Sequence, residues 1–453
     1  MGISPEELSA GLARVCARAG LGAPSGLTRL TGGAVMESWH FWSGGGGFVL
    51  RRAPSLEFME GRPYGHDTEA ALICSANAAG VTAPRVMALL RPEDGIGSGF
   101  IMQALPGTAD PKVILECADP AGLLLQAARD LARIHSLRQA DVPDGVPVMD
   151  YPAAIADLKQ QFIEAGGDRP IIALGLKWLE DNCPPQVEPV LNHGDYRMGN
   201  LLADGSRLTG VLDWEIAHFG DRHEDLAFGC MAVWRFARYD RPALGLGSLE
   251  DYFTAYEAES GTTVDPARFR FWTIYRTVWW ALGCLKMAAQ WRLGADRMLE
   301  RVVISRRTSE QELDLLLLLE GDAPRAKRRG WVPDSLTDQE FDPKGEATSA
   351  EIAVAVSEWL GTLKDKLSGH DRFQLAVARN ALGILERASR SAYVDLLPDD
   401  GDALSEQILS GEKTLADKYL LQDLRFSALE CVRADSPKYP ALKAARKKWL
   451  GEE

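Results

Sequence analysis

The chain has 453 residues, of which 46% are hydrophobic and 25% are charged. These proportions are ordinary for a folded globular protein, and the length exceeds one compact domain, so we expect two or three domains. The formal net charge of −14 at pH 7 argues against non-specific binding to nucleic acid or to an acidic membrane surface.

Cysteine usage indicates a reducing compartment. The seven cysteines are scattered with no close pair, which predicts free thiols in a cytoplasmic protein and neither a zinc site nor a disulfide framework. The first residues have no basic start and no apolar core, so we expect no signal peptide. The longest apolar stretch, 273–291, contains Arg276 and Lys286, and it therefore predicts a buried helix rather than a membrane span.

The first hundred residues predict a helix followed by short strands. Apolar residues recur at helical spacing over 5–18, and 27–52 are typical of three strands separated by glycine-rich segments. Gly32 and Gly33 lie where backbone N–H groups can approach a phosphate, although an ordinary hairpin loop fits the same residues. Further strands are predicted at 81–90 and 99–103, with a helical stretch around residue 69 before them.

From residue 115 onward the sequence is mostly helical. Helices are predicted at 126–137, 152–165, 170–182, 225–237, 249–260, 266–291 and 296–320. A basic segment at 323–330 predicts a linker, and 345–450 predict a separate helical unit that begins with a capping box from Thr348 to Glu351. Its helices are predicted at 352–363, 370–389 and 415–434. This unit contains no catalytic motif, so capping of a pocket, dimerisation and binding of a partner protein all stay open.

The most informative stretch is HGDYRMGN at 193–200, followed by DWE at 213–215. Phosphoryl transfer from a nucleotide needs a carboxylate that orients the acceptor hydroxyl, an amide oxygen on one Mg²⁺, and an acid on the ions that bridge the phosphates. Asp195, Asn200 and Asp213 match these three roles in chain order.

A predicted hairpin supports this interpretation. An Asp-Gly pair at 204–205 lies between two short apolar runs, which is a strong β-hairpin signal because glycine accepts the positive φ of a tight turn. The hairpin would bring Asn200, before its first strand, next to Asp213, after its second. The plain alternative is an ordinary surface hairpin with acids at its ends.

These motifs resemble the aminoglycoside phosphotransferase family of small-molecule kinases, and most of all its subgroup associated with acyl-CoA dehydrogenases, where GDYRxGNLL and LDWE are usual. The likeness covers roughly residues 25–320. It implies an α+β, protein-kinase-like fold with a small antiparallel-sheet N-terminal lobe at 1–105 and a mostly helical C-terminal lobe at 106–322. A linker at 323–344 and a C-terminal helical bundle at 345–453 of unknown function would follow.

The resemblance also implies nucleotide-binding residues. Arg51 aligns with the third-strand cation that holds the α- and β-phosphates, and Glu69 is its candidate ion-pair partner. Lysine is usual at that position, but arginine keeps the charge and can grip phosphate through two nitrogens. Gly33 is expected to approach the phosphates, and Gln103 and Leu105 lie where the hinge backbone would bond the adenine edge. An ordinary surface ion pair is the alternative for Arg51 and Glu69.

The other residues around the loop have open or supporting roles. His193 is expected to brace the loop. Arg197 is expected to neutralise developing charge, to contact the acceptor, or to form a plain salt bridge. Glu215 is either a supporting group or an acceptor contact, and Asp221 and Asp225 are expected to be buried stabilisers that accept backbone N–H groups.

The predicted function is ATP-dependent transfer of the γ-phosphoryl group to a hydroxyl of a small molecule, with Asp195 and Arg197 as catalytic residues and Asn200 and Asp213 on Mg²⁺. The acceptor is open between an aminoglycoside-like compound and a hydroxyacyl-CoA or hydroxy acid, and GTP is an alternative donor. The expected partners are the small-molecule acceptor and, as an option, a second copy in a homodimer, without nucleic acid or membrane.

Two other classes stay open. One is a nucleotide-binding pseudokinase or regulatory module that acts through its C-terminal helical domain, since the usual lysine is Arg51. The other is a metal-dependent hydrolase that uses His193 and Asp195. The hydrolase is the poorer alternative, because no second histidine at ligand spacing accompanies them.

Overall fold

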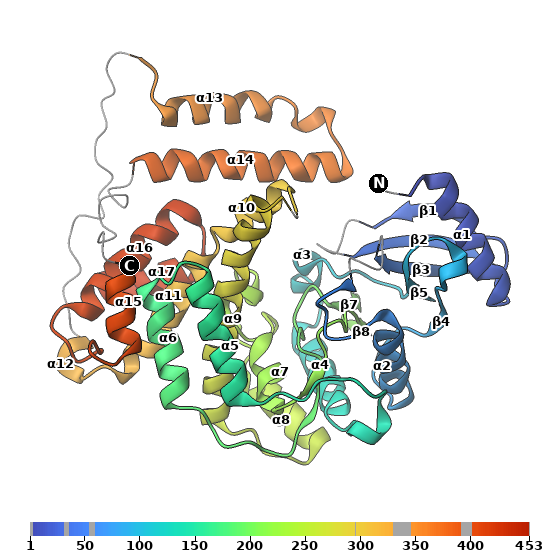
Figure 1. The fold of residues 1–453 in the computed structure, drawn as a ribbon, viewed down its shortest axis with the longest axis horizontal. Coiled ribbons are helices and arrows are strands. Elements are labelled where there is room, and N and C mark those ends of the chain that lie inside the picture. The colour runs from blue at the N-terminus through green and yellow to red at the C-terminus, as the bar shows by residue number, and fades with distance from the viewer. Residues whose placement is uncertain are drawn as a thin grey trace. The chain divides into compact units, whose positions relative to one another are not determined.

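The computed structural model describes residues 3–30, 36–53, 59–294, 296–328, 346–390 and 401–452. They form two compact units (Figure 1), the first made of Met1–Asp150 and Gln186–Phe269 and the second of Tyr151–Pro185 and Arg270–Glu453. The second unit includes residues from before the predicted linker at 323–344 as well as residues after it. The domain boundaries predicted from the sequence stay a prediction. Most of the predicted linker at 323–344 lies outside the described residues.

A five-stranded antiparallel sheet opens the first unit, in the order β1-β2-β3-β5-β4. Its strands are β1 (Ser25–Arg29), β2 (Glu37–Ser43), β3 (Gly46–Ala53), β4 (Val86–Leu89) and β5 (Ser98–Gln103). The three strands predicted within 27–52 are confirmed. The strand predicted at 81–90 is shorter than expected, since β4 begins only after Pro84.

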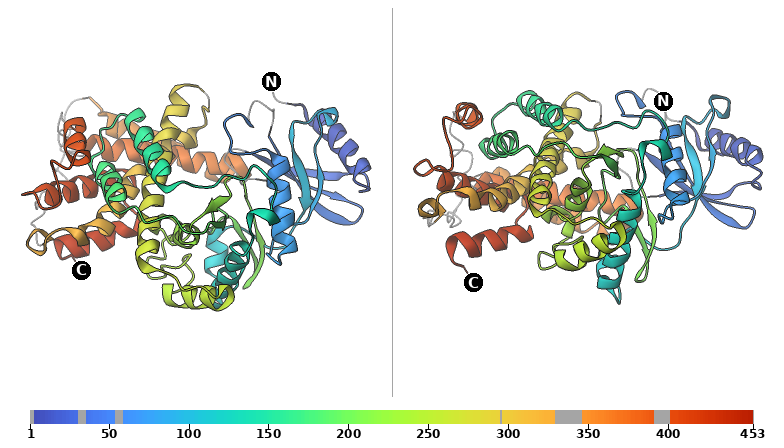
Figure 2. Two further views of the ribbon diagram at one scale, coloured as in Figure 1. Left: turned by 60° about the horizontal axis from the view of Figure 1, so that its bottom comes forward. Right: turned by 90° about the horizontal axis from the view of Figure 1, so that it is seen from below.

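Two helices flank this sheet, α1 (Pro5–Arg18) and α2 (His66–Ala78), and Figure 2 shows the strands between them. Ile101 of β5 packs in one hydrophobic cluster with Leu8 of α1. The next residue back, Phe100, belongs to a second cluster that includes Leu72 of α2. Because successive side chains of a strand point to opposite faces, each helix covers one face of the sheet.

The remainder of the first unit combines helices with two short sheets, β6–β9 and β7–β8. Its elements are α3 (Pro111–Leu115), α4 (Pro120–Ile134), β6 (Val190–Asn192), β7 (Leu201–Asp204), β8 (Arg207–Val211), β9 (His218–Gly220), α7 (Arg222–Phe228) and α8 (Leu249–Ser260). Strands β7 and β8 form the predicted hairpin, with Asp204 opposite Arg207. Gly205 in its turn has a φ of 59°, which glycine adopts without strain.

The second unit is helical in its described residues. Its helices are α5 (Tyr151–Glu164), α6 (Pro170–Asp181), α9 (Pro266–Arg292), α10 (Leu299–Ser305), α11 (Thr308–Leu319), α12 (Arg325–Arg328), α13 (Ser349–Gly361), α14 (Gly369–Arg390), α15 (Gly401–Leu409), α16 (Leu420–Asp435) and α17 (Pro440–Leu450). Helix α9 begins in the last residues of the first unit. Helices α12, α15 and α17 are additional to those that the sequence predicts, and the predicted capping box at Thr348 is confirmed.

Two predicted helices differ from the structure. The helix predicted over 296–320 is divided by a turn at 306–307 into α10 and α11, and the helix predicted over 225–237 is wrong. In place of a helix over 225–237, α7 ends at Phe228 and only a short 3-10 turn, η4 (Ala232–Arg235), follows. A β-carbon on Gly229 would lie 2.6 Å from the carbonyl oxygen of Tyr196, so the chain passes very close to the loop here. Phe236 and Ala237 then have positive φ angles, which end any helix. Close tertiary packing overrides the helical pattern of the segment.

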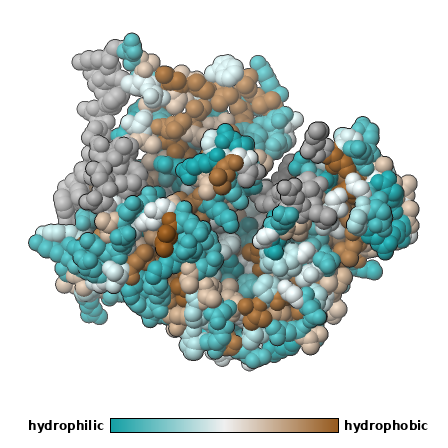
Figure 3. Space-filling model, in the orientation of Figure 1, coloured by the Kyte–Doolittle hydropathy of each residue, from teal (hydrophilic) through white to brown (hydrophobic). Residues whose placement is uncertain are grey.

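Helix α13 presents an apolar stripe to solvent, visible as brown residues in Figure 3. Ile352, Val356 and Trp359 lie at helical spacing and are all exposed, Trp359 to 62%. None of the described helices is long and apolar enough to cross a membrane.

Candidate active site

The backbone of the 193–200 loop is held by a buried carboxylate from α7. Asp225 accepts the N–H of His193 at 2.5 Å and that of Gly194 at 2.8 Å. Although burial opposes its charge, hydrogen bonding with His135 and the loop holds the pKa of Asp225 below its ordinary value. His135 in turn contacts the Tyr256 hydroxyl at 2.7 Å. Asp225 therefore stabilises the loop as the sequence analysis expected.

Gly194 is required by the shape of this loop. Its φ is 82°, and a β-carbon there would lie 2.5 Å from the carbonyl oxygen of Ile216. Any other residue would be both strained and obstructed. The loop can therefore approach the segment that carries Asp213 only because residue 194 is glycine.

His193 links the loop to that same segment. Its Nδ1 accepts the N–H of Asp195 at 3.2 Å, so its Nε2 carries the proton that is donated to the carbonyl oxygen of Leu212 at 3.1 Å. Burial lowers the pKa of His193, which keeps the ring neutral. Because both ring nitrogens are engaged, His193 offers no metal ligand, and the hydrolase alternative loses its histidine.

Asp195 is surrounded by donors. Arg197 holds its two oxygens through Nε at 2.7 Å and Nη2 at 3.1 Å, and Asn200 donates to Oδ2 from Nδ2 at 2.5 Å. Burial raises the pKa of Asp195 to about 6, against the opposing charge of Arg197 and with a smaller contribution from Asp213. The carboxylate is therefore mostly ionised at pH 7. The Arg197 guanidinium also stacks on Trp234, 4.1 Å from the ring centroid.

The β7–β8 hairpin brings Asn200 and Asp213 to the same end, as predicted. Leu201 pairs with Val211, and the N–H of Leu212 donates to the carbonyl oxygen of Asn200 at 2.9 Å. Asp213 has a φ of 70°, a left-handed conformation that a residue with a β-carbon adopts only at a cost. Its side chain is 30% exposed, so solvent and solutes can reach the carboxylate.

The Arg51 guanidinium contacts three carboxylates. Its Nε lies 3.0 Å from Oε1 of Glu69, without hydrogen-bond alignment, and its Nη2 contacts Asp213 at 2.6 Å and Glu215 at 2.8 Å. Although burial opposes its charge, these carboxylates hold the pKa of Arg51 above its ordinary value. The predicted ion pair of Arg51 with Glu69 is present in the structure. Burial raises the pKa of Glu69 to about 7, against the charge of Arg51.

Two residues that the sequence does not single out complete this cluster. Arg62 contacts Glu215 through Nη1 at 3.0 Å, and the hydroxyl of Tyr64 donates to the carbonyl oxygen of Trp214 at 2.5 Å. They come from the short segment before α2, about 150 positions away in the chain. No local pattern marks them, and only their proximity in the folded chain identifies them.

The predicted hinge residues lie beside the hairpin. The N–H of Gln103 donates to the carbonyl oxygen of Arg85 at 2.8 Å, and Leu105 packs against Gly210 of β8. The N–H of Thr108 then donates to the carbonyl oxygen of Ala203 at 2.9 Å. This segment therefore joins the sheet to the hairpin, and its contact with adenine stays a prediction. Gly33 lies outside the described residues.

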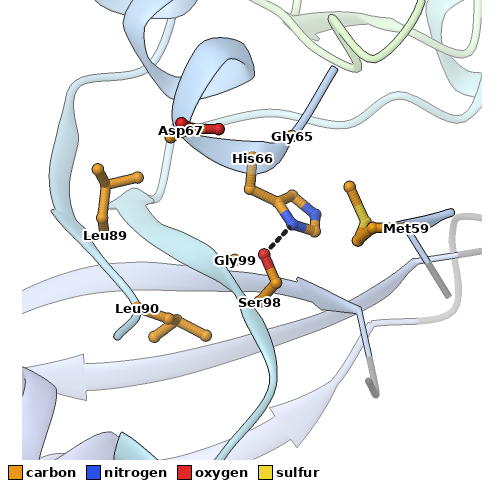
Figure 4. Close-up of a pocket in the computed structure, with 8 residues that line it drawn as sticks. All are labelled: Met59, Gly65, His66, Asp67, Leu89, Leu90, Ser98 and Gly99. Carbon is orange, nitrogen blue, oxygen red and sulfur yellow. Dashed lines mark hydrogen bonds between the residues drawn. The ribbon is translucent and has the colours of Figure 1, made fainter. Parts of the chain in front are cut away.

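A cavity of about 280 Å³ elsewhere in the first unit contains none of the predicted site residues. It lies between the start of α2 and the strands β4 and β5, where Nδ1 of His66 lies 2.9 Å from the Ser98 hydroxyl oxygen (Figure 4). Its lining residues are Met59, Gly65, His66, Asp67, Leu89, Leu90, Ser98 and Gly99. The candidate active site is therefore identified by the side chains clustered around Arg51 and Asp195, and this cavity is separate from it.

The donor set of Asn200 and Asp213 suits Mg²⁺. Among the described residues, no group of three or more His, Cys, Asp and Glu side chains is placed to hold a metal ion. Mg²⁺ differs from zinc in this respect, because it commonly binds one or two protein oxygens together with substrate phosphates. The Nδ2 of Asn200 faces Asp195, which turns its amide oxygen away from that carboxylate. Asn200 and Asp213 thus supply an amide oxygen and a partly exposed carboxylate at the same end of the hairpin.

Comparisons with known proteins found similar sequences and similar folds. The profile described as the phosphotransferase enzyme family matches residues 26–272. Acyl-CoA dehydrogenase family member 10 of Mus musculus is 30% identical over 229 residues, 46% of this chain and 21% of that protein. Hygromycin-B 4-O-kinase of Escherichia coli is 27% identical over 224 residues, 45% of this chain and 61% of the kinase. The chain thus spans only about a fifth of the length of the first of these relatives.

Among solved structures, a proposed aminoglycoside phosphotransferase from Ralstonia eutropha superimposes with a TM-score of 0.54 at 20% identity. The match covers 70% of this chain and 98% of the other. At this identity the likeness concerns the fold alone. It confirms the predicted α+β, protein-kinase-like class, with an antiparallel sheet in the N-terminal lobe and a helical remainder.

Proposed function

Because this chain belongs to the phosphotransferase enzyme family, we propose that it transfers the γ-phosphoryl group of ATP to a hydroxyl group of a small molecule. One observation carries the proposal. Asp195, Asn200 and Asp213 meet at the end of one hairpin, with Asn200 bonded to the Asp195 carboxylate and to the residue before Asp213. They supply the carboxylate, the amide and the second acid that phosphoryl transfer requires.

Asp195 is proposed to orient the acceptor hydroxyl. The acceptor oxygen forms a bond to the γ-phosphorus while the bond from that phosphorus to the β–γ bridging oxygen breaks, so ADP leaves and Asp195 takes the hydroxyl proton. The transition state is loose and asks mainly for positioning, so a carboxylate with a pKa of about 6 is sufficient. Arg197, which grips both oxygens, is proposed to keep this carboxylate oriented.

Arg51 is proposed to contact the nucleotide phosphates, and Asn200 and Asp213 to hold Mg²⁺. Nη1 of Arg51 is the nitrogen that the three carboxylates around it do not occupy, so it can turn to a phosphate oxygen. The bound ion would neutralise charge on the phosphates. Glu69 is proposed to orient the Arg51 guanidinium, because its carboxylate is 3% exposed and contacts Nε, on the side away from Nη1.

The acceptor is proposed to be either a hydroxyacyl-CoA or hydroxy acid, or an aminoglycoside-like compound. The relatives named acyl-CoA dehydrogenase family members 10 and 11 support the first class. The relative named hygromycin-B 4-O-kinase supports the second. The two classes differ in charge, and a direct assay separates them.

The test is phosphate transfer by the full chain from Mg·ATP to a panel of hydroxyacyl-CoAs, hydroxy acids and aminoglycosides, with products identified by mass. We expect transfer to one class, lost in Asp195→Asn and Asp213→Asn. Asp240→Asn is the matched control, because that carboxylate is 68% exposed and lies outside the cluster. Failure of the wild-type chain to bind Mg·ATP at all would overturn the proposal.

One observation favours a second candidate, a nucleotide-binding regulatory protein. Both oxygens of Asp195 already accept from Arg197, so an acceptor hydroxyl would have to share an oxygen with that guanidinium. Tight nucleotide binding without transfer to any member of the panel, in both the wild type and Arg197→Gln, would favour this candidate over the phosphotransferase.

A further inference from the structure

The segment before α2 contacts two consecutive residues of the candidate metal-binding stretch. Tyr64 donates its hydroxyl proton to the carbonyl oxygen of Trp214 at 2.5 Å. Arg62 contacts the Glu215 carboxylate at 3.0 Å. Residues 62–64 and 213–215 therefore lie side by side, although neither stretch belongs to a regular helix or strand.

These contacts matter because Asp213 has an unfavourable backbone. Its φ of 70° lies in the left-handed region, which residues other than glycine adopt infrequently, and aspartate is among those that tolerate it best when neighbouring contacts hold it. On the N-terminal side, Leu212 is fixed by its N–H bond to Asn200 and by the His193 ring on its carbonyl oxygen. On the C-terminal side, the contacts from residues 62–64 perform the same task.

Trp214 itself is well anchored in the first unit. Its side chain is fully buried, its indole N–H donates to the carbonyl oxygen of Val211 at 3.1 Å, and its ring lies 4.8 Å from that of His193. The side chain is therefore held in place, and the Trp214 carbonyl oxygen accepts the Tyr64 hydroxyl together with the N–H of Ala217 at 3.2 Å. Rotation of the peptide after Trp214 would change the direction of both neighbouring carboxylates.

Glu215 is shared by two arginines. Its Oε2 contacts Nη2 of Arg51 at 2.8 Å as well as Nη1 of Arg62. Loss of Arg62 would leave this oxygen with Arg51, whose Nη2 also contacts Asp213 at 2.6 Å. A shift of Glu215 would therefore act on Asp213 through the guanidinium that both acids share.

We propose that Tyr64 and Arg62 are positioning residues that fix the direction of the Asp213 carboxylate and so set the affinity of the site for Mg²⁺. The inference rests on the proposed function, since it concerns the same metal site. It adds two residues of the N-terminal part, Tyr64 and Arg62, to those proposed for the site. Partners that orient a metal ligand typically change metal affinity 10–100-fold when they are removed.

The test is a titration of the full chain with Mn²⁺, followed by electron paramagnetic resonance, in the presence of a saturating non-hydrolysable ATP analogue. We expect Tyr64→Phe to weaken Mn²⁺ binding about 10-fold or more while leaving metal-free analogue binding unchanged. Tyr252→Phe is the matched control, because its hydroxyl is buried and has no hydrogen-bond partner among the described residues. A purely structural role for Tyr64 would lower thermal stability without this selective loss.

Arg62 supplies an independent variant in case Tyr64→Phe does not fold. Arg62→Gln should also weaken Mn²⁺ binding. Arg62→Lys, which keeps the charge, should bind Mn²⁺ more tightly than Arg62→Gln but less tightly than the wild type. Arg91→Gln, an exposed arginine outside the cluster, is its control. If the wild type binds the metal–nucleotide complex and both variants bind Mn²⁺ as their controls do, the inference is wrong. If the wild type binds no nucleotide, it is the proposed function that fails.

Discussion

Arg51 on β3 and Glu69 on α2 form a buried ion pair, with 3.0 Å between Nε and Oε1. The pair joins the sheet to the helix that covers one of its faces, and Glu69 is 3% exposed. Burial raises the pKa of Glu69 to about 7, the neighbouring guanidinium opposes the shift, and the charges of Asp213 and Glu215 add smaller contributions to it. Three carboxylates therefore surround the Arg51 guanidinium, and one of them, Glu215, also contacts Arg62.

The raised pKa of Glu69 predicts that its charge destabilises the fold at neutral pH. The folded state binds a proton that the unfolded state, with a pKa near 4.5, has already lost. The stabilising contribution is thus fully present below about pH 4.5 and is lost as pH rises through 7. A change of this size corresponds to roughly 3 kcal/mol.

Glu69→Gln should remove this dependence. Urea unfolding of the wild type and the variant between pH 5 and 8 measures it, and the wild type should lose stability relative to Glu69→Gln as pH increases. A constant difference between the two proteins across this range would show that Glu69 does not titrate there. Under the proposed function, the variant should also bind nucleotide more weakly, since Arg51 loses a contact.

The raised pKa of Asp195 predicts how the rate of the proposed transfer falls at acidic pH. Burial raises its pKa to about 6 while Arg197 opposes the shift, so the proposed transfer should increase with pH and level off above about 7. Arg197→Gln should move this midpoint to higher pH, because it removes the opposing charge. Steady-state rates from pH 5 to 8 check both midpoints. Arg207→Gln, 68% exposed, is the control and should keep the midpoint of the wild type.

Much of the site could be predicted from the sequence because its core is local. HGDYRMGN, the Asp-Gly turn and DWE lie within 23 positions, so one hairpin suffices to bring Asn200 next to Asp213. The ion pair of Arg51 with Glu69 followed from the family resemblance and is also present.

The contacts of Tyr64 and Arg62 could not be predicted in the same way. Each spans about 150 positions, and neither residue lies in a repeating pattern. The missed end of α7 has a related cause, since the close approach of Gly229 to Tyr196 belongs to the tertiary structure alone. Local propensity favours a helix there, and packing overrides it.

Asp225 is expected to contribute to the free energy of unfolding, because it accepts two buried N–H groups of the 193–200 loop. Asp225→Ala would leave the N–H groups of His193 and Gly194 buried without an acceptor, at about 1–3 kcal/mol for each. Thermal or chemical unfolding should show a loss of about 2–5 kcal/mol, and the proposed transfer should fall with it. Asp240→Ala, at an exposed carboxylate, should be nearly neutral.

Two buried acids, Asp314 on α11 and Glu320 just after it, predict that α16 and α17 are needed for the stability of the second unit. Glu320 follows that helix, is 3% exposed, and accepts from Nε of Arg425 at 3.1 Å and from the indole N–H of Trp449 at 2.8 Å. Asp314 of α11 accepts from the hydroxyl of Tyr439. Helices α16 and α17 thus satisfy buried carboxylates that lie before residue 323, outside the predicted accessory domain.

Arg425→Ala should therefore destabilise the second unit by about 3–5 kcal/mol, the usual cost of leaving one partner of a buried ion pair uncompensated. The site residues all lie in the first unit, so nucleotide affinity at low temperature should change little. Chemical unfolding and nucleotide titration of the same sample measure both quantities. Arg433→Ala, whose side chain is 22% exposed, is the comparison on the same helix. Full stability of Arg425→Ala would mean that Lys448, the other cation at Glu320, can compensate for the charge alone.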